Sequence, residues 1–123
     1  MKERAVIEKE WAKEKYNVMM HSQKHYDLIR EKLKRDISLS ELKELISEGL
    51  SNTPEAGAVI NTFDHMWGYF KKVCTTGEKE KYLELKKEYK EGGVSREKML
   101  RSIKSLADKY EVEYLQNSTV LKN

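Results

Sequence analysis

The stretch NTFDHMWGYFKK, residues 61–72, decides the fold of this chain and marks its candidate site. At about 100° per residue, one side of this helix is apolar, and an apolar side is what a helix buries. That side consists of Val59, Phe63, Met66, Phe70 and Val73. A separate stripe at i, i+4, i+7 and i+11 carries Asn61, His65, Gly68 and Lys72. Core packing does not require an amide, an imidazole and an ammonium in one line, so the pattern predicts a helix that also binds something.

Outward from this stretch, periodicity and capping residues predict helices throughout the chain. An unbroken helix is expected over residues 3–35, because its apolar side chains keep one line and no glycine or proline interrupts them. Further helices are predicted after Ser38 or Ser40, over 54–73 with Thr53 as N-cap, from about 75 to Gly92, and from Ser95 to about Tyr110. A last turn is expected near residues 112–115, and the tail after Gln116 should fray.

Composition supports one all-α domain. The chain has 123 residues, of which 37% are charged, and a single proline. This length suits one core, and dense Glu and Lys usage favours long helices. Because no segment alternates with period two, the sequence predicts no strand. The fold class expected for residues 1–123 is therefore a single-domain bundle of about five helices.

The charge balance and the single cysteine exclude several classes of function. The formal net charge is only +3, so any contact with nucleic acid must come from local placement of basic residues. Cys74 alone supports neither an internal disulfide nor an all-cysteine cluster within one chain. No apolar run is long enough to span a membrane, and no signal peptide precedes the first helix. We expect a cytoplasmic protein without a membrane partner.

The first predicted helix carries a second polar cluster. Lys15, Ser22 and His25 fall inside its apolar arc, and His21 lies at the edge. Each can be explained structurally, since a lysine stem can snorkel and a serine can bond to a preceding carbonyl. His21 and His25 have the i, i+4 spacing of two metal ligands. A metal site that also includes His65 is therefore one alternative, although neither a metal nor a cofactor is our expectation.

The surface inventory favours binding over catalysis. Nucleotide-binding loops and the hydrolase nucleophile elbow are absent. Basic residues near aromatic rings supply phosphate contacts and stacking platforms, which is how unpaired RNA is held. The basic members are Lys15, Lys24, Lys71 and Lys72, and the aromatic ones are Tyr16, Tyr26, Trp67 and Tyr69. An exposed Trp67 that anchors a partner helix is the basis of another alternative, a protein–protein adaptor.

Two segments in register resemble the YbgA-like family of small helical domains. The first is EKYNVMMHSQKHYDLI, residues 14–29, and the second is residues 61–72 followed by EKEKYLELKKEYKEG, residues 78–92. Order and separation also fit, so the resemblance covers nearly the whole chain. Carried over residue by residue, it points to Lys15, His21, Ser22, Tyr26, Asn61, His65, Gly68, Tyr69, Phe70 and Lys71.

The resemblance implies a role in RNA metabolism. Family members occur alone or fused to an iron–sulfur desulfidase domain that acts on thiouracil or on 4-thiouridine in tRNA, and the helical part looks like an RNA-binding accessory. We therefore expect a non-catalytic RNA-binding domain, with tRNA as the expected class, that works beside a separately encoded desulfidase. The site residues expected from all this are Lys15, His21, Ser22, Lys24, Tyr26, Asn61, His65, Gly68, Tyr69, Lys71 and Lys72. The oligomeric state is not fixed by the sequence.

Overall fold

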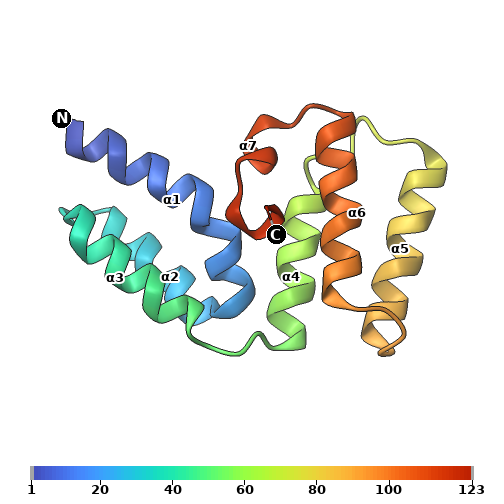
Figure 1. Ribbon diagram of the computed structural model, residues 1–123, viewed down its shortest axis with the longest axis horizontal. Coiled ribbons are helices and arrows are strands. Elements are labelled where there is room, and N and C mark those ends of the chain that lie inside the picture. The colour runs from blue at the N-terminus through green and yellow to red at the C-terminus, as the bar shows by residue number, and fades with distance from the viewer. Residues whose placement is uncertain (1, 123) are drawn as a thin grey trace.

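A computed structural model describes residues 2–122, which form seven α-helices and one short 3₁₀ helix (Figure 1). The helices are α1 (Lys2–His21), α2 (Gln23–Leu33), α3 (Leu39–Leu50), α4 (Ala56–Trp67), α5 (Thr76–Lys90), α6 (Arg96–Lys109) and α7 (Glu113–Gln116), followed by η1 (Thr119–Leu121). Within these residues there is no strand. The all-α prediction is confirmed, and the expected count of about five helices is too low.

The first predicted helix is in fact two helices. The backbone of Ser22 is extended, with φ −159° and ψ 102°, and its hydroxyl accepts a hydrogen bond from the N–H of His25 at 3.1 Å. This is an N-cap, which starts a new helix. The chain then turns back, so that Arg4 at the start of α1 donates to the carbonyl of Leu33 at the end of α2. An unbroken helix over 3–35 is therefore wrong, and α1 and α2 form an antiparallel pair.

The third helix closes over this pair. Ser38 caps α3, as expected, by accepting from the N–H of Glu41 at 3.1 Å. Gly49 is buried near the end of α3, where a methyl group would lie 3.1 Å from His25 Cβ and 3.3 Å from a Val18 methyl. The missing side chain therefore allows α3 to approach both α1 and α2 closely.

The predicted helix over 54–73 is shorter at both ends. It begins after Glu55 instead of Thr53, and it ends at Trp67, after which residues 68–73 form turns. Trp67 is buried and stacks on Tyr82 of α5, with ring centroids 4.5 Å apart. Because the chain leaves the helix at Gly68, Val73 is turned outward and is 54% exposed. Its expected place in the buried arc is wrong, whereas the other four residues of that arc are buried.

Polar contacts fix α5 against its neighbours. Thr75 caps α5, and Glu78 completes a capping box by accepting from the N–H of Thr75 at 2.9 Å. The same carboxylate accepts from Lys109 at 2.6 Å and from the hydroxyl of Tyr110. These hydrogen bonds, the one from Lys109 foremost, lower the pKa of Glu78 to about 2. Farther along α5, Tyr82 and Lys86 donate to Asp64 of α4, both at 2.9 Å.

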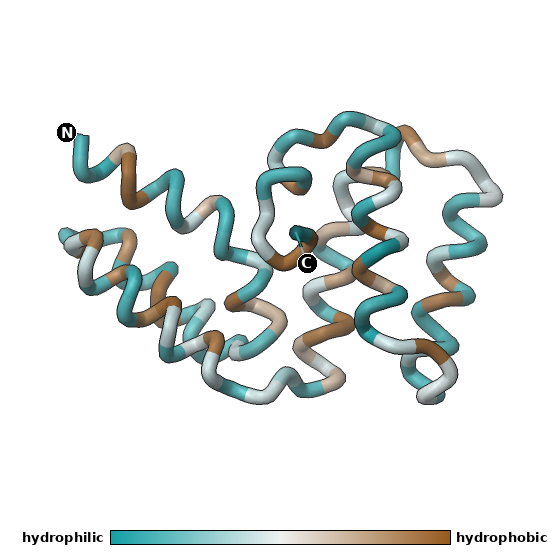
Figure 2. Tube along the Cα trace, in the orientation of Figure 1, coloured by the Kyte–Doolittle hydropathy of each residue, from teal (hydrophilic) through white to brown (hydrophobic). Residues whose placement is uncertain are grey.

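The C-terminal segment is docked, which contradicts the expected fraying after Gln116. Val120 and Leu121 of η1 are buried, and η1 packs against α1 and α6. Figure 2 shows this apolar stretch in brown beside the C label. Thr119 adds a hydrogen bond from its hydroxyl to Glu14 Oε1 at 2.7 Å. Burial of two aliphatic side chains stabilises the segment by several kcal/mol in all, about 1.5–3 for each. Among the described residues, no helix is long and apolar enough to cross a membrane.

Candidate functional site

A cluster of four tyrosines consists of Tyr16 of α1, Tyr26 of α2, Tyr69 in the turn after α4, and Tyr114 of α7. The hydroxyls of Tyr16 and Tyr69 are 3.1 Å apart, and their rings meet edge to face at 6.4 Å. Tyr114 of α7 stacks on Tyr69, with centroids 6.0 Å apart and an interplanar angle of 17°. Tyr16 is buried, whereas the rings of Tyr69 and Tyr114 are 40% and 38% exposed. The cluster therefore presents a two-ring aromatic surface that rests on a buried ring.

Two cations border this tyrosine cluster. Lys15 Nζ lies 5.5 Å from the Tyr16 ring centroid, and the Arg30 guanidinium lies 5.6 Å from the Tyr26 centroid. Neither cation forms an ion pair with any carboxylate of residues 2–122. Burial, and then the nearby positive charge of Arg30, lower the pKa of Lys15. Both effects disfavour the charged form of Lys15, and a bound anion would offset them by stabilising that form.

Burial also governs the acid–base state of the tyrosines. It is the main cause that raises the pKa of Tyr16, and the hydrogen bond to Tyr69 raises it further. Burial likewise raises the pKa values of Tyr26 and Tyr114. All three hydroxyls are therefore protonated at neutral pH, where they can donate hydrogen bonds. None of them has the lowered pKa of a nucleophile or general base.

The polar residues of α4 and of the turns that follow it, called the α4 stripe below, are solvent-exposed. The stripe comprises Asn61, His65, Gly68, Tyr69, Lys71 and Lys72, all of which lie at the surface. No ion pair within residues 2–122 involves Lys71 or Lys72. A methyl group on Gly68 would contact only the chain's own backbone, at 3.2 Å from the His65 carbonyl oxygen. The surface above Gly68 is thus open to a ligand.

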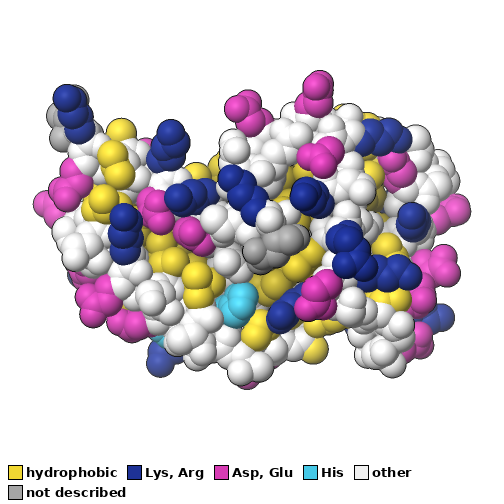
Figure 3. All heavy atoms as spheres, viewed as in Figure 1, with side chains coloured by type: hydrophobic (Ala, Val, Ile, Leu, Met, Phe, Trp, Pro, Cys, Tyr) yellow, Lys and Arg dark blue, Asp and Glu magenta, His cyan; other side chains and the backbone are white. Residues whose placement is uncertain are grey.

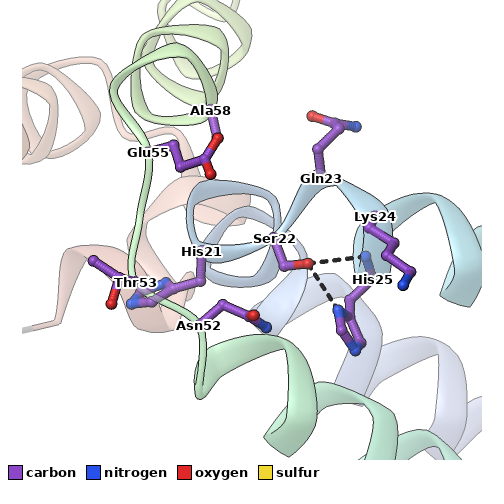
Figure 4. Close-up of a pocket in the computed structure, with 9 residues that line it drawn as sticks. All are labelled: His21, Ser22, Gln23, Lys24, His25, Asn52, Thr53, Glu55 and Ala58. Carbon is purple, nitrogen blue, oxygen red and sulfur yellow. Dashed lines mark hydrogen bonds between the residues drawn. The ribbon is translucent and has the colours of Figure 1, made fainter.

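A depression of about 540 Å³ lies at the junction of α1 and α2 (Figure 4). One wall is formed by His21, Ser22, Gln23, Lys24 and His25, and the other by Asn52, Thr53, Glu55 and Ala58. Ser22 bonds both the backbone and the ring of His25, the latter at 2.7 Å from Oγ to Nδ1. His21 contacts the carbonyl of Asn17 through Nδ1 at 2.8 Å. Three of the four polar residues that were unexpected on the apolar side of an unbroken helix, His21, Ser22 and His25, therefore surround the break in that helix, whereas Lys15 lies beside Tyr16.

The depression and the α4 stripe meet at one residue. Gln23 borders the depression, and its side-chain oxygen accepts from Asn61 at 3.1 Å. Because polar groups on an apolar arc need partners, the sequence predicts that the helix of residues 15–26 packs beside that of residues 61–72 and brings Ser22 or His25 near Asn61 or His65. The packing is confirmed, since α1 packs on α4 and Tyr16 contacts Tyr69 just beyond the end of α4. The residue that carries the link to Asn61 is Gln23, not Ser22 or His25. His25 faces α3 instead, with Nε2 3.8 Å from Glu48.

Two alternatives from the sequence can be compared with this geometry. Within residues 2–122, no group of three histidine, cysteine or carboxylate side chains is arranged to hold a metal ion. His21 and His25 border the same depression, but His65 does not. Trp67, expected to be an exposed anchor for a partner helix, is buried against Tyr82. That expectation is wrong because α4 presents Trp67 to α5.

The sequence reading missed Gln23, Arg30 and Tyr114. Gln23 follows Ser22 directly, but its importance depends on the helix break, which periodicity did not reveal. Arg30 lies four residues after Tyr26 on the same helix, so their i, i+4 spacing was an available signal. Tyr114 carried no such signal, because it meets Tyr69 only when the C-terminal segment folds back against the rest of the molecule. Tyr26, expected as a platform, is buried against Trp11, with ring centroids 5.8 Å apart.

Comparison with known proteins supports the resemblance found in the sequence. No curated protein sequence and no solved structure matches this chain. A family model described as "Protein of unknown function (DUF1722)" matches residues 15–123, which is most of the chain and includes both motif segments except Glu14. YbgA-like domains belong to this family. The chain therefore belongs to the DUF1722 family.

Proposed function

We propose that this protein binds RNA, with tRNA as the expected class, and does so without catalysing a reaction itself. The observation that carries the proposal is the exposed Tyr69–Tyr114 pair beside Lys15 and Arg30, two cations without a carboxylate partner among residues 2–122. Aromatic faces accept unpaired bases, and unpaired cations accept phosphates. Both halves of a nucleotide thus have a complementary surface.

The α4 stripe supplies the second part of the proposed interface. Lys71 and Lys72 are exposed and adjoin Tyr69 in the chain, where they can contact further phosphates. Asn61 and His65 offer hydrogen-bonding groups one helical turn apart, and Gly68 leaves room for close approach of the ligand backbone. His21, Ser22 and Lys24 at the depression extend the polar surface beyond Gln23. In this proposal Ser22 is mainly structural, because its hydroxyl already caps α2.

The proposed partner is a separately encoded thiouracil or 4-thiouridine desulfidase. This part depends on the family resemblance, in which the helical domain accompanies such an enzyme. A helper that holds tRNA near a desulfidase should lower the KM for tRNA and leave kcat unchanged. The test is steady-state desulfidation of thiolated tRNA with and without this protein. An unchanged KM at saturating concentrations of the helper would contradict the partnership.

Binding itself can be tested with bulk tRNA in a gel-shift titration at two salt concentrations. Replacing Lys71 and Lys72 together by Ala should weaken binding to all RNA sequences and reduce the slope of log K against log salt by about 1.4, because two phosphate contacts are lost. Tyr69→Ala should cost about 1–3 kcal/mol of binding free energy with little change in slope, since stacking releases no counterions.

Two controls accompany this test. Tyr69→Phe keeps the ring and should retain most of the affinity, although it removes the hydroxyl contact to Tyr16. Melting curves of each variant separate lost binding from lost folding. Absence of tRNA binding by the folded wild-type protein at low salt would refute the proposed function.

A further inference from the structure

A second hollow lies between α1 and α7. It has a volume of about 400 Å³, within the range of about 300–1,000 Å³ that small ligands occupy. Its walls are formed by Lys9, Ala12, Lys13, Tyr114, Asn117 and Lys122. Figure 3 shows the notch between the N-terminal half of α1 and the α7 segment, with Lys and Arg side chains along it and some Asp and Glu side chains beside them. We call this hollow the α1–α7 cleft.

The α1–α7 cleft is positively charged. Three of its six lining residues are lysines, and none is a carboxylate. Lys13 is partly neutralised by Glu10, with Nζ 3.2 Å from the carboxylate. Lys9 and Lys122 are exposed and form no ion pair within residues 2–122. The cleft therefore suits an anionic ligand.

Tyr114 connects this cleft to the tyrosine cluster. Tyr114 lines the cleft and also stacks on Tyr69. Tyr16 meets Tyr114 edge to face at 6.3 Å and supports it from below. Tyr114 thus joins the cleft to the exposed ring pair, and Lys15 and Arg30 border the same tyrosine cluster. Cations therefore lie both in the cleft and beside the tyrosine cluster.

We propose that the α1–α7 cleft holds an unpaired segment of the RNA strand whose neighbouring base stacks on Tyr69 and Tyr114. This inference rests on the proposed function and adds the strandedness of the ligand and its path across the surface. A groove with a positive wall and stacking rings binds single strands with little sequence preference. A base held in a duplex cannot offer its face to Tyr114, so the cleft selects unpaired RNA over paired RNA.

The test compares RNA lengths by fluorescence anisotropy. The probes are a labelled trinucleotide, a labelled single strand of about twelve nucleotides, which is within the range of known single-strand sites, and a blunt RNA duplex of the same length. The variant is Lys9→Ala with Lys122→Ala. It should weaken binding of the long strand about fivefold or more, lower its salt slope by about 1.4, and leave trinucleotide binding almost unchanged.

A matched control is Lys43→Ala with Lys87→Ala. These lysines are also exposed and in no ion pair of the described residues, but they lie on α3 and α5 and do not line the cleft. Removing them should change long-strand affinity less than twofold, because salt screens charges that lie far from the bound strand. If the cleft variant lowers long-strand affinity by no more than this control does, the proposed role of the cleft is wrong.

The remaining outcomes separate the two proposals. If the cleft variant binds the long strand as tightly as the wild type does, while Tyr69→Ala weakens it, the cleft is wrong and the proposed function stands. If the duplex binds as tightly as the single strand, and the cleft variant weakens both equally, selection of unpaired RNA is wrong. If the wild type binds no RNA probe, both proposals fail together.

Discussion

The two family segments each contain a place where a predicted helix stops, and the two places stop it in different ways. At Ser22 the chain reverses, and a side-chain cap starts the next helix. At Gly68 no side chain caps the end, and the chain continues through turns with Gly68 itself still helical at φ −52° and ψ −28°. Packing of Trp67 and Phe70 holds that second end. A local side-chain cap therefore starts the helix after the first break, whereas tertiary packing holds the second end.

The largest effect is expected at the end that packing holds. Trp67→Ala removes a buried ring that stacks on Tyr82, and we expect a loss of about 3–5 kcal/mol in the free energy of unfolding. Trp11→Ala is the matched change in the other half of the molecule. Because Trp11 is only partly buried, its loss should be clearly smaller. Urea denaturation measures both, and equal losses would contradict the contrast between the two ends.

A smaller effect is expected at the capped break. Ser22→Ala removes the hydroxyl that accepts from His25 N–H and contacts its ring, and should cost about 1 kcal/mol. Ser22→Asp, which can also cap a helix, should restore most of that stability. Ser38→Ala at the start of α3 provides a reference for an ordinary cap. If Ser22→Ala leaves stability unchanged, then packing against α3, not the cap, holds the reversal.

The smallest effect on stability is expected at Gly68. Its backbone angles are open to any residue, and a methyl group would contact only backbone carbonyl oxygens, that of His65 at 3.2 Å and that of Asp64 at 3.8 Å. Gly68→Ala should change the free energy of unfolding by no more than about 0.5 kcal/mol. Under the proposed function it should nevertheless weaken tRNA binding, because the methyl group occupies the surface that the ligand approaches. A destabilisation above about 1 kcal/mol would indicate a strained turn instead.

Local signals were sufficient for part of the fold. Ser95 was predicted correctly as a cap, and Ser38 was one of the two caps predicted for α3, because a cap uses a side chain and an N–H only three residues apart. The buried positions Val59, Phe63, Met66 and Phe70 also followed from periodicity, since a helix fixes which side chains share a face. The same spacing placed Asn61 and His65 on one exposed face of α4. Lys72 is exposed as well, but it lies beyond the end of the helix, so helical spacing no longer fixes its place.

Other features depended on contacts between distant parts of the chain. The apolar residues before and after Ser22 follow the same helical period, so the sequence pattern does not reveal a break there. The break becomes visible only because α2 returns along α1. The same return made Gln23, not Ser22, the neighbour of Asn61. Tyr114 and Lys122 became candidate site residues because the C-terminal segment docks.

The sequence by itself determined that this protein is helical, where most of its helices begin, and which side of α4 is buried, because these properties depend on side chains within a few turns of one another. Tertiary structure decided that the first helix folds back, that Trp67 is buried and Val73 exposed, and that the tyrosines of α1, α4 and α7 share one surface. Those outcomes depend on which helices pack together, and the free energy of that packing belongs to pairs of residues far apart in the chain.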